Sequence, residues 1–200
     1  MKKIVYLSVA LMGILAFVSC EGFGQKGNGD EDTLAVVPLN EIPEIEEVRG
    51  RVGDGSSMNV LELITGDNDT LNIEVSASII AGGLMEGDEM DVIFSRLDSA
   101  LVSTIAINVT TLQHLWTQRS SQGGTQSLEI NPDGNATTYN MGNIDYDHWS
   151  LLDGQLLLHS PRLPGVESSG YTDTFDILML TNDTLVLSAG DAQSIFWREN

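Results

Sequence analysis

Hydrophobic and polar residues alternate with a period of two over much of the chain after residue 44. Leu71, Ile73 and Val75 are separated by polar residues, and the same alternation recurs at 90–94 and 105–109. Successive side chains of a strand point to opposite faces, so this period predicts half-buried antiparallel strands. Up to residue 110 the pattern predicts five strands, near 46–53, 58–65, 69–76, 89–95 and 101–110. Such a run of short strands predicts a small barrel, OB-like or SH3-like, with half of a β-sandwich as the alternative.

The second half of the chain predicts about eight short strands that are joined mainly by hairpins. Tight turns are indicated at Asn131-Pro132-Asp133-Gly134, at Asp153-Gly154 and at Asn182-Asp183. The strands are expected near 115–118, 128–130, 137–141, 146–152, 156–159, 174–180, 185–188 and 194–198. An up-and-down meander of this length can close into a barrel, and strands this short favour a lumen filled by side chains. Helical signals are weak, and only 77–84 is open to one short helical turn.

The N-terminus carries the pattern of an export signal. Lys2 and Lys3 precede an uncharged apolar run at 4–18, and the run ends at Ser19-Cys20. Phe17-Val18-Ser19-Cys20 resembles a lipobox. The resemblance implies cleavage before Cys20, diacylglycerol on its thiol, and acylation of the new amine by a fatty acid such as palmitate. The alternative is a plain secretory signal that ends near a cysteine.

Composition divides the chain into four parts. We expect a lipoprotein signal peptide at 1–19, a flexible lipid-anchored tether at 20–43, a small β-barrel domain at 44–111 and a second β-domain at 112–200. The tether is rich in glycine and acidic residues and contains too little apolar surface to fold. The expected location is the outer membrane, with the periplasmic or surface face left open.

The charge of the chain narrows the range of partners. The sequence has 29 acidic and 9 basic residues and a formal net charge of −20, which becomes −22 when Lys2 and Lys3 are removed with the signal. Such a field repels phosphate backbones, so no nucleic acid is expected as a partner. It also repels anionic lipid, which leaves the N-terminal acyl chains as the membrane contact.

The second half resembles the lipocalin-like domains of bacterial lipoproteins from Gram-negative gut lineages. The resemblance rests on Leu115-Trp116, on 128–134 with its Pro-Asp-Gly turn, on Tyr146-Asp147-His148-Trp149, on 152–156, on 171–175 and on 180–187. It implies a lipocalin-like up-and-down β-barrel without known catalytic residues. Gln113-His114 stand where lipocalins typically place a glycine shortly before the tryptophan. In the first half, 87–92 resembles the turn that starts a strand in OB-like folds, which implies a fold and no function.

Motifs for catalysis and for metal binding are not found. The sequence contains no Gly-x-Ser-x-Gly and no His-Glu-x-x-His, so we expect no enzyme, no catalytic residue, no metal site and no cofactor. Asp173 and Asp176 remain open as a carboxylate pair for a glycan hydrolase. His148 near Asp145 and Asp147 is either a weak ligand cluster or part of a polar strand face.

Aromatic and hydroxyl side chains supply the remaining candidate sites. Five aromatic residues form either a ligand-binding patch or the barrel core: Trp116, Trp149, Tyr171, Phe175 and Trp197. Four Asp-(Ser/Thr)-aliphatic triplets resemble an acceptor motif for O-glycosylation in the periplasm, with Thr33, Thr70, Ser99 and Thr184 as candidate hydroxyls.

These expectations describe a membrane-anchored, non-catalytic envelope module. It would bind a small apolar ligand, a glycan ligand or an envelope protein. The alternative is a structural or accessory subunit of an envelope complex with no small ligand, and a glycan hydrolase is the third class.

Overall fold

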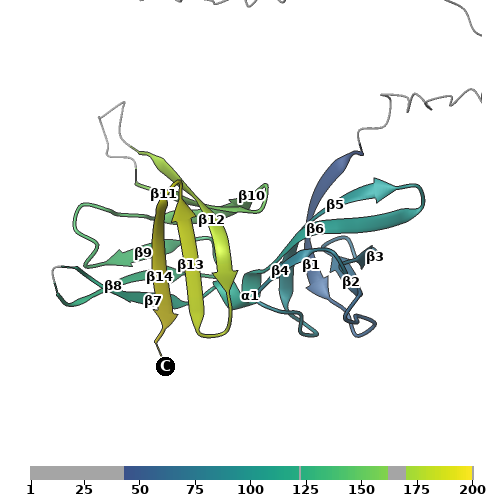
Figure 1. The fold of residues 1–200 in the computed structure, drawn as a ribbon, viewed down its shortest axis with the longest axis horizontal. Helices are drawn as coiled ribbons and strands as arrows, with labels where there is room; N and C mark the ends of the chain where they lie inside the picture. The colour runs from purple at the N-terminus through teal and green to yellow at the C-terminus, as the bar shows by residue number, and fades with distance from the viewer. Residues whose placement is uncertain (1–42, 122, 162–169, 200) are drawn as a thin grey trace, which may run out of the picture. The chain divides into compact units, whose positions relative to one another are not determined.

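The structure, a computed structural model, describes residues 43–121, 123–161 and 170–199. The expected signal peptide, almost all of the tether, Cys20 and Thr33 lie outside these residues. Residues 40–200 form one compact unit that contains two sheets, whose strands pair mainly antiparallel (Figure 1). Among the described residues, no helix has the length and apolarity needed to cross a membrane.

The first sheet forms a closed five-stranded barrel with one short added strand. Its strands are β1 (Ile45–Val52), β2 (Val60–Thr65), β3 (Thr70–Glu74), β4 (Ile79–Ala81), β5 (Glu89–Leu97) and β6 (Ala100–Asn108). The order β3-β2-β1-β5-β6 closes through a parallel pairing of β3 with the start of β6, and β4 pairs in parallel with a later part of the same edge of β6, opposite β5. The five-stranded barrel is therefore confirmed, whereas its OB-like character stays a prediction. The helical turn considered at 77–84 is wrong, because strand β4 occupies its centre.

Alternating apolar residues of these strands meet in one core. Leu61, Leu63, Ile73 and Met90 are fully buried there. Gly50 allows β1 and β2 to approach closely at this point, because a Cβ at residue 50 would lie 2.7 Å from the carbonyl oxygen of Ile64. The barrel is thus filled by side chains.

One carboxylate of this sheet is buried. Asp91 on β5 is 8% exposed, and its Oδ2 lies 3.7 Å from Nη2 of Arg49, its cross-strand partner on β1. Burial and, to a smaller extent, the neighbouring Glu47 raise the pKa of Asp91 to about 6 against the opposing effect of Arg49. The folded protein therefore holds this carboxyl in an environment that favours its protonated form.

Asp91 makes the stability of the protein depend on pH. Its pKa is 3.8 without the folded environment and about 6 within it, so between these values the folded state binds a proton that the unfolded state releases. The free energy of unfolding should consequently fall by about 2–3 kcal/mol as pH rises from 4 to 7. We expect Asp91→Asn to remove this decline and to be the more stable protein at pH 7, as measured by urea denaturation across the pH range. Glu89→Gln, which removes an exposed carboxylate beside Arg49, should leave the decline in place; equal slopes for the wild-type protein and Asp91→Asn would contradict the assignment.

The second sheet forms a nearly closed eight-stranded barrel. Its strands are β7 (Leu115–Arg119), β8 (Thr125–Ile130), β9 (Ala136–Tyr139), β10 (His148–Leu152), β11 (Gln155–His159), β12 (Thr172–Leu180), β13 (Thr184–Ala189) and β14 (Ala192–Arg198). Consecutive strands pair antiparallel except at the seam between β9 and β10, which holds only the isolated bridge Asn135–His148. At the other junction the last strand returns to the first through two residue pairs, Trp197–Thr117 and Arg198–Trp116. The predicted eight-stranded up-and-down barrel is confirmed (Figure 1).

A short helical turn precedes the second barrel and was not predicted. Helix α1 spans Val109–Leu112, so the strand expected to reach residue 110 ends at Asn108. Val109 and Leu112 are buried in the core of the second barrel, together with Ala81 and Ile107 from the first sheet. The amide of Gly82 donates a hydrogen bond to the carbonyl oxygen of Leu180 (2.9 Å). The core of the second barrel therefore begins before the boundary expected at residue 112.

Candidate binding site

The lumen of the second barrel is filled at one end and hollow near the other. At the filled end, the Nε1 of fully buried Trp116 donates a 2.8 Å hydrogen bond to the carbonyl oxygen of Leu112 in α1. A cavity of about 160 Å³ remains in the lumen. It shares Gln126 and Met141 with a polar hollow between the β7–β8 and β9–β10 connections. The cavity thus lies toward these connections, which form the mouth of the barrel.

Apolar side chains make up most of the cavity wall. They come from strands all around the barrel and from the β9–β10 connection: Leu128, Met141, Ile144, Leu158, Phe175, Leu187 and Phe196. The polar members are Gln118, Gln126, Tyr146 and Ser194. The Nε2 of Gln118 donates to the Oε1 of Gln126 (3.3 Å), so these two side chains largely satisfy each other. The wall therefore offers an apolar surface with a few polar groups, which is typical of small-molecule sites.

Tyr146 fixes the position of the β9–β10 connection against the barrel. It is 4% exposed, and its hydroxyl donates a 2.5 Å hydrogen bond to Oδ2 of Asp173 on β12. Burial and this hydrogen bond raise the pKa of Tyr146 far above its ordinary value, so the phenol stays protonated. The phenol therefore adds no charge of its own to the cavity wall.

The structure brings only one of the five predicted aromatic residues to the cavity. Phe175 lines it, whereas Trp116 and Trp149 are 0% and 7% exposed and belong to the barrel core. Tyr171 and Trp197 are 46% and 49% exposed and do not line the lumen. The aromatic residues therefore do not form a single binding patch.

The family comparison covers the second barrel and the end of the strand before it. Residues 105–199 match a family model described as lipocalin-like. The second barrel is lipocalin-like. The match begins within β6, which agrees with the contribution of Ile107 and Val109 to the core of the lipocalin-like barrel. Lipocalin-like folds typically serve as binding modules without catalysis.

A solved structure of a lipocalin-like protein from Bacteroides thetaiotaomicron also resembles the chain. It is 23% identical, has a TM-score of 0.38, and the match covers 44% of this chain and 97% of that one. A comparison with curated proteins gives no match.

The carboxylates considered for glycan hydrolysis do not face each other. Asp173 accepts the hydrogen bond from Tyr146, whereas Oδ1 of Asp176 accepts one from Nε2 of Gln155 on the neighbouring strand (2.7 Å). Residues three apart on a strand point to opposite faces of the sheet. Asp173 and Asp176 therefore do not form the facing pair that glycoside hydrolysis requires.

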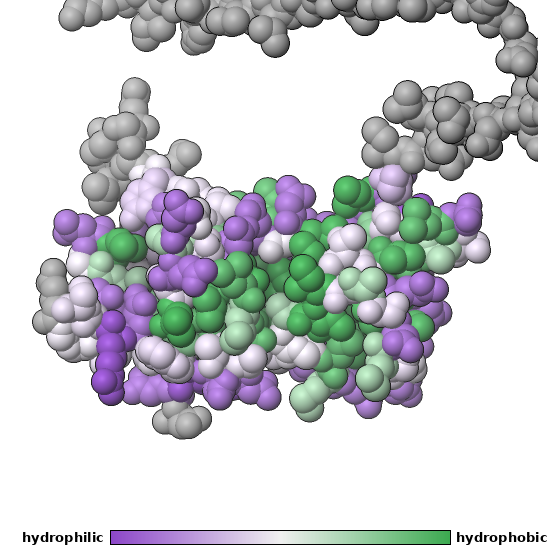
Figure 2. All heavy atoms as spheres, in the orientation of Figure 1, coloured by the Kyte–Doolittle hydropathy of each residue, from purple (hydrophilic) through white to green (hydrophobic). Residues whose placement is uncertain are grey.

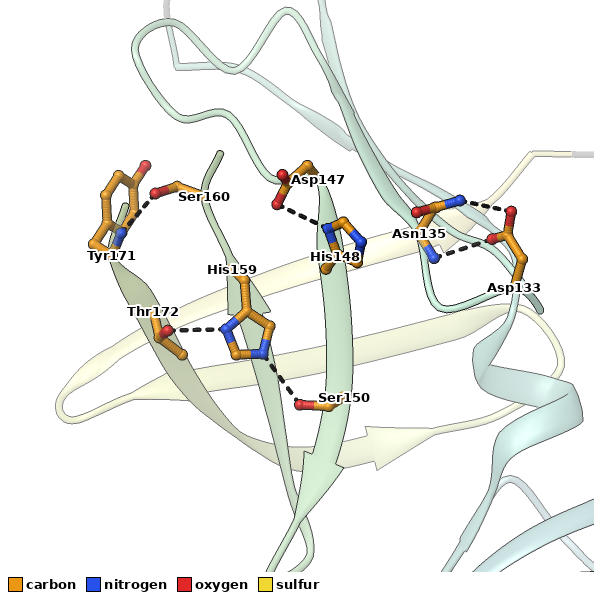
Figure 3. A network of polar contacts seen from close by, with 9 residues as sticks. All are labelled: Asp133, Asn135, Asp147, His148, Ser150, His159, Ser160, Tyr171 and Thr172. Atoms are coloured by element: carbon orange, nitrogen blue, oxygen red, sulfur yellow. Dashed lines mark hydrogen bonds and ion pairs between the residues drawn. The ribbon is translucent and has the colours of Figure 1, made fainter. Parts of the chain in front are cut away.

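A polar network crosses the outer face of β10–β12 (Figure 3). The ring of His159 lies 3.2 Å from Oγ of Ser150 through Nε2 and 2.9 Å from Oγ1 of Thr172 through Nδ1. The imidazole thus links three strands, but its second nitrogen meets a hydroxyl rather than the carboxylate that would orient a catalytic base.

His148 belongs to a separate contact on the same face. Its Nδ1 lies 3.2 Å from Oδ1 of Asp147 (Figure 3). Among the described residues, no three His, Cys, Asp or Glu side chains are grouped so that they could hold a metal ion. The arrangement corresponds to the polar strand face considered for His148.

The candidate O-glycosylation residues within the described ranges differ in accessibility. Thr70 at the start of β3 and Ser99 in the β5–β6 turn are exposed. Thr184 is half-buried, and its hydroxyl donates to Oδ1 of Asp183 (3.1 Å). Thr70 and Ser99 therefore remain the more accessible hydroxyls, and their modification stays a prediction.

Proposed function

We propose that this protein is a non-catalytic envelope module, held on a membrane by lipid at Cys20, whose lipocalin-like barrel binds a small apolar molecule in its lumen. The observation that carries the proposal is the cavity of about 160 Å³ with a mainly apolar wall. A dry apolar cavity of about this volume admits a molecule the size of benzene. The ligand is therefore a small apolar molecule or the end of a longer alkyl chain.

The cavity also sets the expected pattern of affinity. Each methylene transferred from water into an apolar site contributes about 0.8 kcal/mol, which is roughly a four-fold gain in affinity. The gain should stop once the chain fills the available volume. A series of n-alcohols from four to ten carbons, titrated into the protein by calorimetry, should therefore show rising affinity followed by a plateau.

A substitution that fills the cavity tests the location of this site. Ser194 lines the cavity, whereas the adjacent Gln193 is exposed on the same strand. We expect Ser194→Phe to weaken alcohol binding by about ten-fold or more, because the added ring occupies the site. The matched variant Gln193→Phe should bind like the wild-type protein. If no alcohol binds the wild-type protein, the barrel is functionally filled and the structural role in an envelope complex takes the place of this proposal.

The anchor is tested separately from the lumen. The lipobox-like Phe17-Val18-Ser19-Cys20 supports it, and two or more acyl chains suffice for stable membrane association. Mass spectrometry of the protein from its own host should show a chain that starts at Cys20 and carries acyl groups. A product that retains residues 1–19, or one recovered without lipid in the soluble fraction, would contradict the anchor while leaving the lumen proposal untouched.

A further inference from the structure

A second hollow lies on the outer surface of the lipocalin-like barrel, where the last strand meets the first. Its volume is about 510 Å³. Its lining combines one large aromatic residue with five polar residues: Thr117, Gln118, Arg119, Thr125, Trp197 and Glu199. This groove lies outside the lumen and shares only Gln118 with the lumen cavity.

Trp197 presents its indole to this groove from a fixed backbone. Its side chain is 49% exposed, but residue 197 pairs with Thr184 on one side and with Thr117 on the other. The hydroxyl of Thr117 also donates to the carbonyl oxygen of Trp197 (3.1 Å). An exposed ring on a rigid strand forms a preorganised platform, because little conformational freedom is lost when a ligand stacks on it.

Two charged side chains beside this platform have no partner among the residues that the structure describes. The side chains of Arg119 and Glu199 line the groove, and neither has a hydrogen bond or ion pair to any described residue. Gln118, by contrast, directs its side chain into the lumen, where its Nε2 donates to Gln126. The groove therefore offers guanidinium donors, a carboxylate acceptor and threonine hydroxyls beside one aromatic face.

We propose that this groove binds a hexose unit of a neutral glycan. A pyranose ring has an apolar C–H face that can stack on an indole and hydroxyls at its rim that need both donors and acceptors. The groove supplies the two kinds of contact side by side. A nucleic-acid base would also stack on Trp197, but the net charge of −20 opposes the phosphates attached to it. Because one ring and exposed polar groups carry the contact, the dissociation constant should lie at about 0.1–1 mM.

The neighbouring surface supplies the main competing occupant. A row of apolar side chains crosses the outer face of β12–β14. Its members, Met179, Val186 and Ile195, are direct cross-strand neighbours. Figure 2 shows apolar side chains gathered over these strands on the face in view. Trp197 follows Ile195 on the same face of β14, so a protein that covered the whole row would also cover Trp197. The two occupants differ in the residues that they require.

Titration with soluble oligosaccharides distinguishes these cases. The probes are hexasaccharides of glucose, galactose, mannose and N-acetylglucosamine, and binding is measured by calorimetry and by the change in tryptophan fluorescence. At least one probe should bind in a saturable manner. Trp197→Ala should weaken its binding by at least ten-fold and Trp197→Phe by less, while Arg119→Ala and Glu199→Gln should each weaken it by about three-fold or more.

Matched variants complete the test. Tyr171→Ala and Ile195→Ala each remove a side chain that is 46% exposed outside the groove, and both should bind the glycan like the wild-type protein. An equal loss in Ile195→Ala and Trp197→Ala would overturn the proposal in favour of a broad protein-docking face. Failure of every probe to bind the wild-type protein would also overturn it. Saturating the lumen with an alcohol should leave glycan binding unchanged, so this proposal can fail independently of the lumen site.

Discussion

Trp116→Ala is expected to lower the free energy of unfolding by about 3–5 kcal/mol. The indole is fully buried in the core of the lipocalin-like barrel, and its Nε1 holds the carbonyl oxygen of Leu112. That carbonyl is at the C-terminal end of α1, where no later helical amide can reach it. The substitution therefore opens a large cavity and also leaves a backbone acceptor without its donor. Urea denaturation followed by far-UV circular dichroism measures the loss.

The same substitution at an exposed tryptophan provides the control. Trp197 lies on the strand that pairs with β7, next to Arg198, the cross-strand partner of Trp116. It is 49% exposed, so Trp197→Ala should cost less than about 1 kcal/mol. Trp116→Phe keeps most of the apolar volume and should cost an intermediate amount. Similar losses for the two alanine variants would show that Trp116 does not anchor the barrel core.

The hairpins of both barrels were predictable because their signals are local. Asp153 and Gly154 both have positive φ values (52° and 74°), as a two-residue turn between antiparallel strands requires. The turn residues and the alternation on either side of them lie within a few positions in the sequence. Eight strands of the second barrel could therefore be placed within a few residues of their observed bounds.

The strand pairings that close the two barrels could not be predicted from local sequence patterns. The parallel pairing of β3 with β6 and the return of β14 to β7 join residues that are far apart in the chain. Periodicity states which residues of a strand share a face, but it does not identify the neighbouring strand. Helix α1 was missed for a related reason, because four residues are too few to display a helical period.

The cavity could be predicted only in part for the same reason. Strand β14 carries Ile195, Phe196 and Trp197 in succession, so apolar residues occupy both faces and alternation does not tell which face is inside. The structure places Phe196 in the core and leaves Trp197 exposed. Met141 and Ile144 reach the cavity from an irregular connection that has no periodic pattern. The apolar residues of the lumen and Trp197 of the groove could therefore be recognised in the sequence, but their grouping into two separate sites required the fold.

Asn108→Ala is expected to lower the free energy of unfolding by about 2–4 kcal/mol, the second largest effect. Asn108 is fully buried between the last strand of the first sheet and α1. Its Oδ1 accepts a 2.8 Å hydrogen bond from the amide of Thr111 and so caps α1. Its Nδ2 donates to the carbonyl oxygen of Gly83 (3.2 Å) and to Oδ2 of Asp88 (2.6 Å). Alanine fills none of these roles, and the half-buried amide of Thr111 and carboxylate of Asp88 would lose their partner.

Two further variants separate the contributions of this amide. Asn108→Ser retains a capping oxygen and should recover part of the loss. Asn108→Asp retains the cap but places a second carboxylate against Asp88, so its stability should fall as both groups ionise. Asn72→Ala removes an exposed asparagine from the middle of β3 and should change the free energy of unfolding by less than about 0.5 kcal/mol. If Asn108→Ala were equally mild in chemical denaturation, the buried amide would not be what holds β6, the 82–88 connection and α1 together at the filled end of the lipocalin-like barrel.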